Sequence, residues 1–232
     1  MALAPPAVRP DLIRLLRDLG SEVRRGGSDP REARDLATGV PAIDALLGGG
    51  LARGRLCELH GPLSSGRTSL ALALLARATE AGEVVAVVDP ADAFHPASAR
   101  DAGVRLERVL WARPPGVSEA VRACERLLQA RGFAVVLLDA AGRDREWQAL
   151  PAAVWQRLAR AAAAGGTALI VISRRRVTGT HADLALALQP IGVRFTGTPC
   201  LFEGLELEAA IARQRRGRPG RPVAVGLRAA PD

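Results

Sequence analysis

Four short segments of the chain are almost continuously apolar and rich in valine, leucine and isoleucine. They cover residues 55–60, 84–89, 134–139 and 168–173. Strands that are buried on both faces of a parallel sheet have this pattern, because neither face needs polar side chains. The pattern therefore predicts four buried parallel strands.

Helical spacing of apolar residues separates these segments. It covers residues 68–81, 118–130 and 151–164, and Ser118 is expected to cap the second of these helices. Strands that alternate with helices predict an α/β fold, in which a doubly wound, mainly parallel sheet is flanked by helices.

Near the end of the chain the apolar period changes to two. Leu205, Leu207, Ala209 and Ile211 alternate with polar or small residues, and the alternation resumes over residues 223–227. A period of two is typical of half-buried strands. The intervening stretch is rich in arginine, glycine and proline, so we predict a closing antiparallel hairpin with a basic tip.

The first residues of the chain carry a separate amphipathic pattern. Its apolar face includes Leu12, Leu15, Leu16 and Leu19, and arginines and acidic residues lie between them. A stretch with glycine and proline follows it and breaks the period. We expect a short N-terminal helix and linker over residues 1–30, and a core domain over residues 31–232. The helix would pack on its own domain or on a neighbour.

Composition limits the class of protein. The chain has 232 residues, of which 48% are hydrophobic, which suits one large α/β domain with small appendages. A net charge of +8 favours nucleic acid or an acidic protein face as a partner. The three cysteines lie far apart without metal-ligand spacing. No apolar run approaches the ~18 residues of a membrane span, so we expect a cytoplasmic protein that has no membrane partner.

The strongest chemical signal follows the first predicted strand. Residues 61–69, Gly-Pro-Leu-Ser-Ser-Gly-Arg-Thr-Ser, have the pattern of a phosphate-binding loop that opens a helix. In such a loop, backbone N–H groups cradle the phosphates, a lysine neutralises them and a hydroxyl binds Mg²⁺. If nucleotide binding is retained, the residues expected to bind it are Gly61, Ser64, Ser65, Gly66, Arg67, Thr68 and Ser69.

Arginine takes the place of the lysine in this loop. Arg67 keeps the charge, but a planar guanidinium is bulkier than an ammonium group and fits a crowded loop differently. The chain contains no lysine at all, so a general drift towards arginine is an alternative explanation. Thr68 and Asp139, the latter at the end of a predicted buried strand, would hold Mg²⁺ only if a nucleotide binds. ATP with Mg²⁺ is therefore a possible cofactor rather than an expected one.

A family resemblance runs through these segments. Residues 38–51, Gly54-Arg55 and residues 58–66 resemble the start of the RecA ATPase core, and residues 89–93 with Gly103-Val104 resemble its following strand and helix. The resemblance covers about residues 10–228 and is most specific in its first half. In size, arginine content and altered loop, the chain is similar to the ImuA-type RecA-like proteins of damage-induced mutagenesis.

The resemblance implies a RecA-like fold and two kinds of partner: RecA itself, and an ImuB-type adaptor with an error-prone polymerase. It also marks a departure, because Ala91 stands where RecA has its catalytic glutamate, and a methyl group cannot activate water. Asp92 or Glu58 are alternative bases. Short segments at residues 140–150 and 174–180 replace the long DNA-binding loops of RecA, so strand exchange by this chain alone is not expected.

Two groups of arginines complete the candidate residues. Arg174, Arg175 and Arg176 follow a predicted strand end, where open α/β sheets bind ligands; they contact phosphates or a partner, or form a solvated turn. Arg213-Gln214-Arg215 resembles the basic, amide, basic pattern with which RecA reaches across a subunit interface to a neighbour's ATP, and Arg216 extends the basic patch. The alternative is a charged hairpin tip.

Two function hypotheses follow. The first is a non-hydrolysing RecA-like accessory protein of SOS mutagenesis and translesion synthesis. The alternative is an ATP-dependent or ATP-switched protein of recombination or repair that binds single-stranded DNA.

Overall fold

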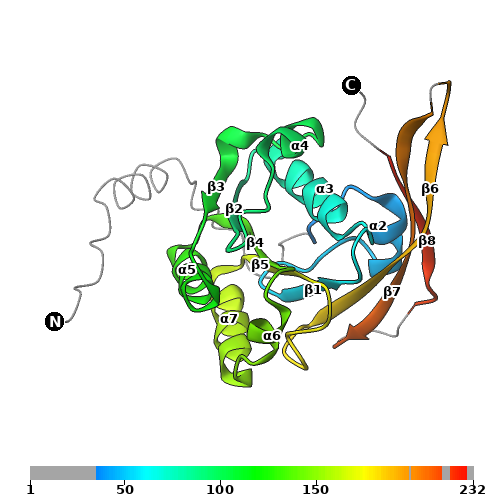
Figure 1. Ribbon diagram of the computed structural model, residues 1–232. Helices are drawn as coiled ribbons and strands as arrows, with labels where there is room; N and C mark the ends of the chain where they lie inside the picture. Colours follow the sequence, from blue (N-terminus) through cyan, green and yellow to red (C-terminus); the bar gives the residue numbers. More distant parts are fainter. Residues whose placement is uncertain (1–34, 199, 216–219, 229–232) are drawn as a thin grey trace.

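The computed structural model describes residues 35–198, 200–215 and 220–228 (Figure 1). The predicted N-terminal helix, with its apolar leucines, lies outside the described residues, and so does Arg216. Among the described helices, none is both long and apolar enough to cross a membrane.

A single mixed sheet of eight strands forms the centre of the fold, in the order β3-β2-β4-β5-β1-β6-β7-β8. Neighbouring strands are parallel from β3 through β6, and the last two pairings are antiparallel. The predicted α/β fold, with a mainly parallel sheet and a closing antiparallel hairpin, is confirmed. The strands are β1 (Leu56–His60), β2 (Val84–Val88), β3 (Val109–Ala112), β4 (Phe133–Ala140), β5 (Ala168–Ser173), β6 (Leu184–Thr196), β7 (Leu201–Gln214) and β8 (Val223–Arg228).

Helices cover both faces of this sheet (Figure 1). One face packs against α2 and α3, and the other against α5 and α7. The three predicted helices match α3, α5 and α7 to within a residue or two at each end, which is the usual uncertainty of helix ends. The helices are α2 (Pro41–Leu47), α3 (Arg67–Glu80), α4 (Pro96–Asp101), α5 (Val117–Ala130), α6 (Asp144–Gln148) and α7 (Ala152–Gly165), with a 3-10 turn at Leu106–Arg108.

The buried strands are apolar at successive positions because each face of the sheet has its own core. Leu137 packs in the core under α3, whereas its neighbour Leu138 packs in the core under α5 and α7. Successive strand residues point to opposite faces, so a strand covered on both sides needs apolar residues throughout. Trp147 and Trp155 pack against each other in the second core, with tilted rings whose centroids are 6.4 Å apart.

Three features differ from the sequence-based expectations. Ser118 does not cap α5, because the extended residue before the helix is Gly116. The edge strand β3 was not predicted; its four residues are all half-buried and show no clear period. The long strand β6 was also missed, since its first half is buried beside β1 while its second half is exposed and contains Pro190 and Gly192.

Candidate functional site at the β1–α3 loop

Two glycines shape the loop between β1 and α3. Gly66 precedes the first turn of α3 with φ +78°, in the left-handed region that favours glycine. A Cβ at Gly66 would collide with the Leu207 side chain, and a Cβ at Gly61 would collide with the carbonyl oxygen of Leu188. Both positions therefore require glycine. The first N–H groups of a helix have no partner within it, so this end of α3 favours an anion.

Arg67 is the first residue of α3, and its side chain turns into the protein. Only 7% of the residue is exposed, and its Nη1 atom is buried without a hydrogen-bond partner. Burial lowers the pKa of Arg67; the charge of Asp139 opposes this shift, and the charge of Arg174 adds to it. A buried guanidinium that lacks a partner is costly, and an anion would compensate it.

Unpaired polar atoms concentrate at this loop. Within the part of the chain that the structure describes, four buried side-chain nitrogen or oxygen atoms lack a hydrogen-bond partner. Three of them, His60 Nε2, Ser65 Oγ and Arg67 Nη1, belong to the loop or to the strand residue before it; the fourth is Trp155 Nε1. Buried polar groups are normally paired. The loop therefore offers a set of polar atoms that suits the phosphate part of a nucleotide.

The two residues expected to hold Mg²⁺ both lie near the carboxyl ends of the parallel strands. Thr68 is exposed in the first turn of α3, and Asp139 is half-buried near the end of β4. Burial raises the pKa of Asp139 and Asp89 adds to the shift, against a hydrogen bond from Ala141 N–H and the charge of Arg67. The residues fit a bound nucleotide, in which Mg²⁺ would supply charge neutralisation on the phosphates.

The end of β2 is arranged differently. Asp89 is buried, and its carboxylate accepts hydrogen bonds from the N–H groups of Ala93 (3.0 Å) and Phe94 (2.8 Å) and from Trp111 Nε1 (3.3 Å). Ala91 lies in the exposed turn that follows. This strand end therefore binds its own backbone and presents a methyl group to solvent.

Neither alternative base lies free at the site. Asp92 is exposed and pairs with Arg113, with an N···O distance of 3.3 Å. Glu58 is fully buried in β1 and accepts hydrogen bonds from Ser173 Oγ (2.9 Å) and Val177 N–H (2.6 Å), and from the hydroxyl and N–H of Thr178. Glu58 thus clamps the segment after β5 onto β1.

The structure brings one group of candidate arginines to the loop. Arg174, Arg175 and Arg176 are exposed in the turn directly after β5, and Ser173 of that strand accepts a backbone hydrogen bond from Gly61. The charge of Arg176 is among the causes that lower the pKa of His60, after burial. The three arginines therefore lie at the carboxyl ends of the parallel strands, as the β1–α3 loop does.

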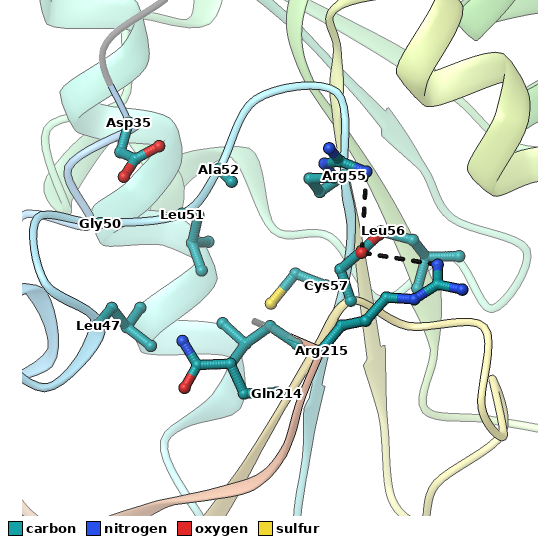
Figure 2. Close-up of a pocket in the computed structure, with 12 residues that line it drawn as sticks. Asp35, Leu47, Gly50, Leu51, Ala52, Arg55, Leu56, Cys57, Gln214 and Arg215 are labelled. Atoms are coloured by element: carbon teal, nitrogen blue, oxygen red, sulfur yellow. Dashed lines mark ion pairs between the residues drawn. The ribbon is translucent and has the colours of Figure 1, made fainter. Parts of the chain in front are cut away.

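The other group, Arg213 and Arg215, lies at the opposite end of the strands. Arg213 pairs with Ala185 near the start of β6, and Arg215 pairs with Asp183 at 3.9 Å. Figure 2 shows Arg215 beside Arg55, which also lies 3.9 Å from Asp183. Arg55, Asp183 and Arg215 line a cavity of about 180 Å³. Apolar residues such as Leu51 and Cys57 also line it, and burial raises the pKa of the Cys57 thiol. The basic pair is thus separated from the β1–α3 loop of its own chain.

A larger groove adjoins the loop and was not foreseen from the sequence. It has a volume of about 640 Å³ and runs between α3, α4 and the last two strands. Ser69 links it to the loop, and its lining residues come from segments far apart in the chain, so no local motif marks it. They include Leu72, Ser98, Ala102, Leu205 and Leu227.

Comparison with known proteins identifies the family. Residues 14–143 match the model of the RecA N-terminal domain, which is more than half of the chain, so the chain belongs to this family. It is 36% identical over 121 residues to Protein RecA of Rhodopirellula baltica and 38% identical over 122 residues to that of Chlorobium limicola. Each match covers 52% of this chain but only 32% and 35% of those relatives, respectively. The chain thus spans about a third of their length.

A solved structure extends the similarity in fold. The crystal structure of the RadB recombinase superposes with a TM-score of 0.66 at 24% sequence identity, covering 82% of this chain and 94% of that one. This likeness shows the fold, including the antiparallel strands that lie beyond the family match.

Proposed function

We propose that this chain is a non-hydrolysing RecA-like accessory protein of damage-induced mutagenesis and translesion synthesis. It acts by contacting RecA and an ImuB-type polymerase adaptor. Membership of the RecA N-terminal domain family supports a relation to recombination and repair. The observation that carries the finer proposal is the pairing of a complete cradle with an inward-turned Arg67 and an exposed Ala91.

The surroundings of these two positions oppose turnover. The Arg67 side chain is buried at the entrance of α3, where a lysine would reach the terminal phosphates. Ala91 has no group that can orient or deprotonate water. Glu58 is saturated with hydrogen bonds, and Asp92 is exposed and bonded to Arg113. Binding without hydrolysis is the chemistry that remains.

The proposed contact with RecA uses the N-terminal apolar segment. Leu12, Leu15, Leu16 and Leu19 share one helical face in the sequence pattern, and we propose that this face packs on a RecA core. The short segment after β5 and the altered loop would then prevent propagation or strand exchange. We propose that the exposed residues Arg174–Arg176 make any direct contact with single-stranded DNA.

Capture of purified RecA by the full chain tests this proposal. The double variant Leu15→Asp/Leu19→Asp should lose capture, because it places two charges in an apolar contact. Arg14→Asp adds a carboxylate on the polar side of the same segment and should leave capture intact. Equal capture by wild type and the double leucine variant would remove the proposed docking segment.

A second candidate function is supported by the unpaired atoms at the loop. His60, Ser65 and Arg67 would be satisfied by a nucleotide phosphate, as expected of an ATP-switched protein that binds single-stranded DNA. Titration with ATP and Mg²⁺ on single-stranded DNA separates the two. Tight binding with turnover that Thr68→Ala abolishes would favour this candidate. DNA affinity that falls steeply with salt would support contact through the arginine turn.

A further inference from the structure

The outer part of the β6–β7 hairpin, residues 189–198 and 200–203, carries an unusual amount of exposed apolar surface. The described part of the chain has six large hydrophobic side chains that are strongly exposed, and five belong to this outer hairpin. Contiguous exposed apolar groups on a soluble protein mark interaction sites. The five are Ile191 (58% exposed), Val193 (53%), Phe195 (56%), Leu201 (64%) and Phe202 (49%).

These side chains are ordered by the strand register. Phe195 lies opposite Phe202, with the ring centroids 6.1 Å apart in an edge-to-face arrangement, and Val193 lies opposite Leu205. Val193 and Phe195 are spaced two residues apart on β6 and project from the same face, whereas Ile191 lies at an irregularity of the register between Pro190 and Gly192. Figure 1 shows the hairpin extending beyond the central sheet, and Phe202 also lines the groove beside α3 and α4.

One edge of the outer hairpin is open. β1 pairs with β6 only from Leu184 to Ala187, and Gly61 then lies against the carbonyl of Leu188. Beyond that point, no strand within the described ranges lies beside β6 on this side. An exposed, apolar strand edge is a template for pairing with another chain.

We propose that this edge pairs with the same edge of a second copy of the chain. The strands would run antiparallel about a two-fold axis at Val193, so that Val193 faces its own copy and Ile191 faces Phe195. Such cross-strand pairs of aromatic and β-branched residues are stabilising. Two-fold dimers use the same patch on both subunits, so the patch must be complementary to itself.

Charge complementarity favours a second copy as the occupant. In this register Arg194 faces Gly192 of the other copy, so no like charges meet. Arg194 is also neutralised within its own chain, because Glu203 and Glu206 each lie 3.8 Å from its Nε. Pro190 has no N–H and closes the ladder at one end. The edge therefore contains no unpaired charge that would demand a partner of opposite sign.

Sedimentation or light scattering on the full chain over a range of concentrations tests the dimer. Val193→Glu places two carboxylates opposite each other and should weaken the dimer about tenfold or more. The matched control is Ala224→Glu, which adds the same charge at an exposed position of β8, the other edge strand on this side of the sheet. It should leave the dimer unchanged, and equal melting temperatures would show that both variants fold.

Cross-linking tests the register itself. In a Cys200→Ser background, Val193→Cys should form a disulfide between two copies, because the residue faces itself across the axis. Cys57 and Cys124 are buried and should not react. Leu201→Cys, on the far strand of the hairpin, should not cross-link. Each of three results would overturn the proposal: a wild-type chain that stays monomeric, a dimer that Val193→Glu leaves intact, or a Val193→Cys variant that fails to cross-link. The open edge of the outer hairpin would then have a different partner.

Discussion

The carboxyl ends of β1 and β2 lie on the same side of the sheet, yet their polar groups are satisfied in opposite ways. After β1, two positions require glycine, and three buried polar atoms in or next to the loop have no partner. After β2, the carboxylate of Asp89 binds its own backbone and Ala91 turns to solvent. The first end has buried polar atoms that an anion would satisfy, whereas at the second end the carboxylate is already satisfied by backbone N–H groups. In our proposal, binding a phosphate and activating water depend on these two separate strand ends, so one can be kept without the other.

The largest predicted effect concerns Glu58, which our proposal treats as a structural clamp and not as a base. Glu58→Ala removes the acceptor of four hydrogen-bond donors, of which only Val177 N–H is part-buried rather than buried, so the free energy of unfolding should fall by about 3–5 kcal/mol. Urea denaturation measures it. Asp92→Ala, which breaks an exposed ion pair, should cost less than about 1 kcal/mol. If Glu58→Ala were as stable as wild type, Glu58 would again be a candidate base.

A smaller effect tests the cradle directly. Inorganic phosphate at tenfold excess over its dissociation constant should stabilise the wild-type chain by about 1.4 kcal/mol, which corresponds to a melting temperature higher by about 3–6 °C. Arg67→Met should abolish this shift, because the buried Arg67 Nη1 then no longer pairs with the anion. Arg160→Met, an exposed position on α7, is the control. An undiminished shift in Arg67→Met would mean that the anion binds elsewhere.

The smallest effect is a pH dependence at His60. Burial lowers the pKa of His60 below its usual 6.5, and the charges of Arg176 and Arg67 also lower it, against Glu58. Below pH 6.5 the unfolded chain binds this proton more readily than the folded chain does, so stability should fall as the pH decreases until it passes below the folded pKa. Thermal melts in that range should show a shallower decline for His60→Asn. An identical decline in both proteins would show that His60 is not the group responsible.

The sequence predicts some parts of the fold better than others. The four central strands are apolar at every position because cores cover both of their faces, so their pattern alone reveals them. β6 was missed because its outer half exposes Ile191, Val193 and Phe195 and is interrupted by Pro190 and Gly192. A strand that is half core and half surface has no single period.

The site shows the same division between local and distant information. Residues 61–69 form a continuous motif, which lies between β1 and the first turn of α3 and contains two positions that require glycine. What surrounds the loop comes from far along the chain: Leu207 packs over Gly66, and Glu58 binds Val177, which is 119 residues away. The same limit applies to Arg213 and Arg215, which lie at the opposite end of the strands, beside the start of β6.

The central claim is that the β1–α3 loop binds an anion but does not support hydrolysis. Its most direct test is the release of phosphate from ATP by the purified full chain, with Mg²⁺ and single-stranded DNA, beside the variant Thr68→Ala. The account predicts that wild type and variant release phosphate at the same rate as protein-free buffer. Sustained turnover by the wild type that disappears in Thr68→Ala would contradict it.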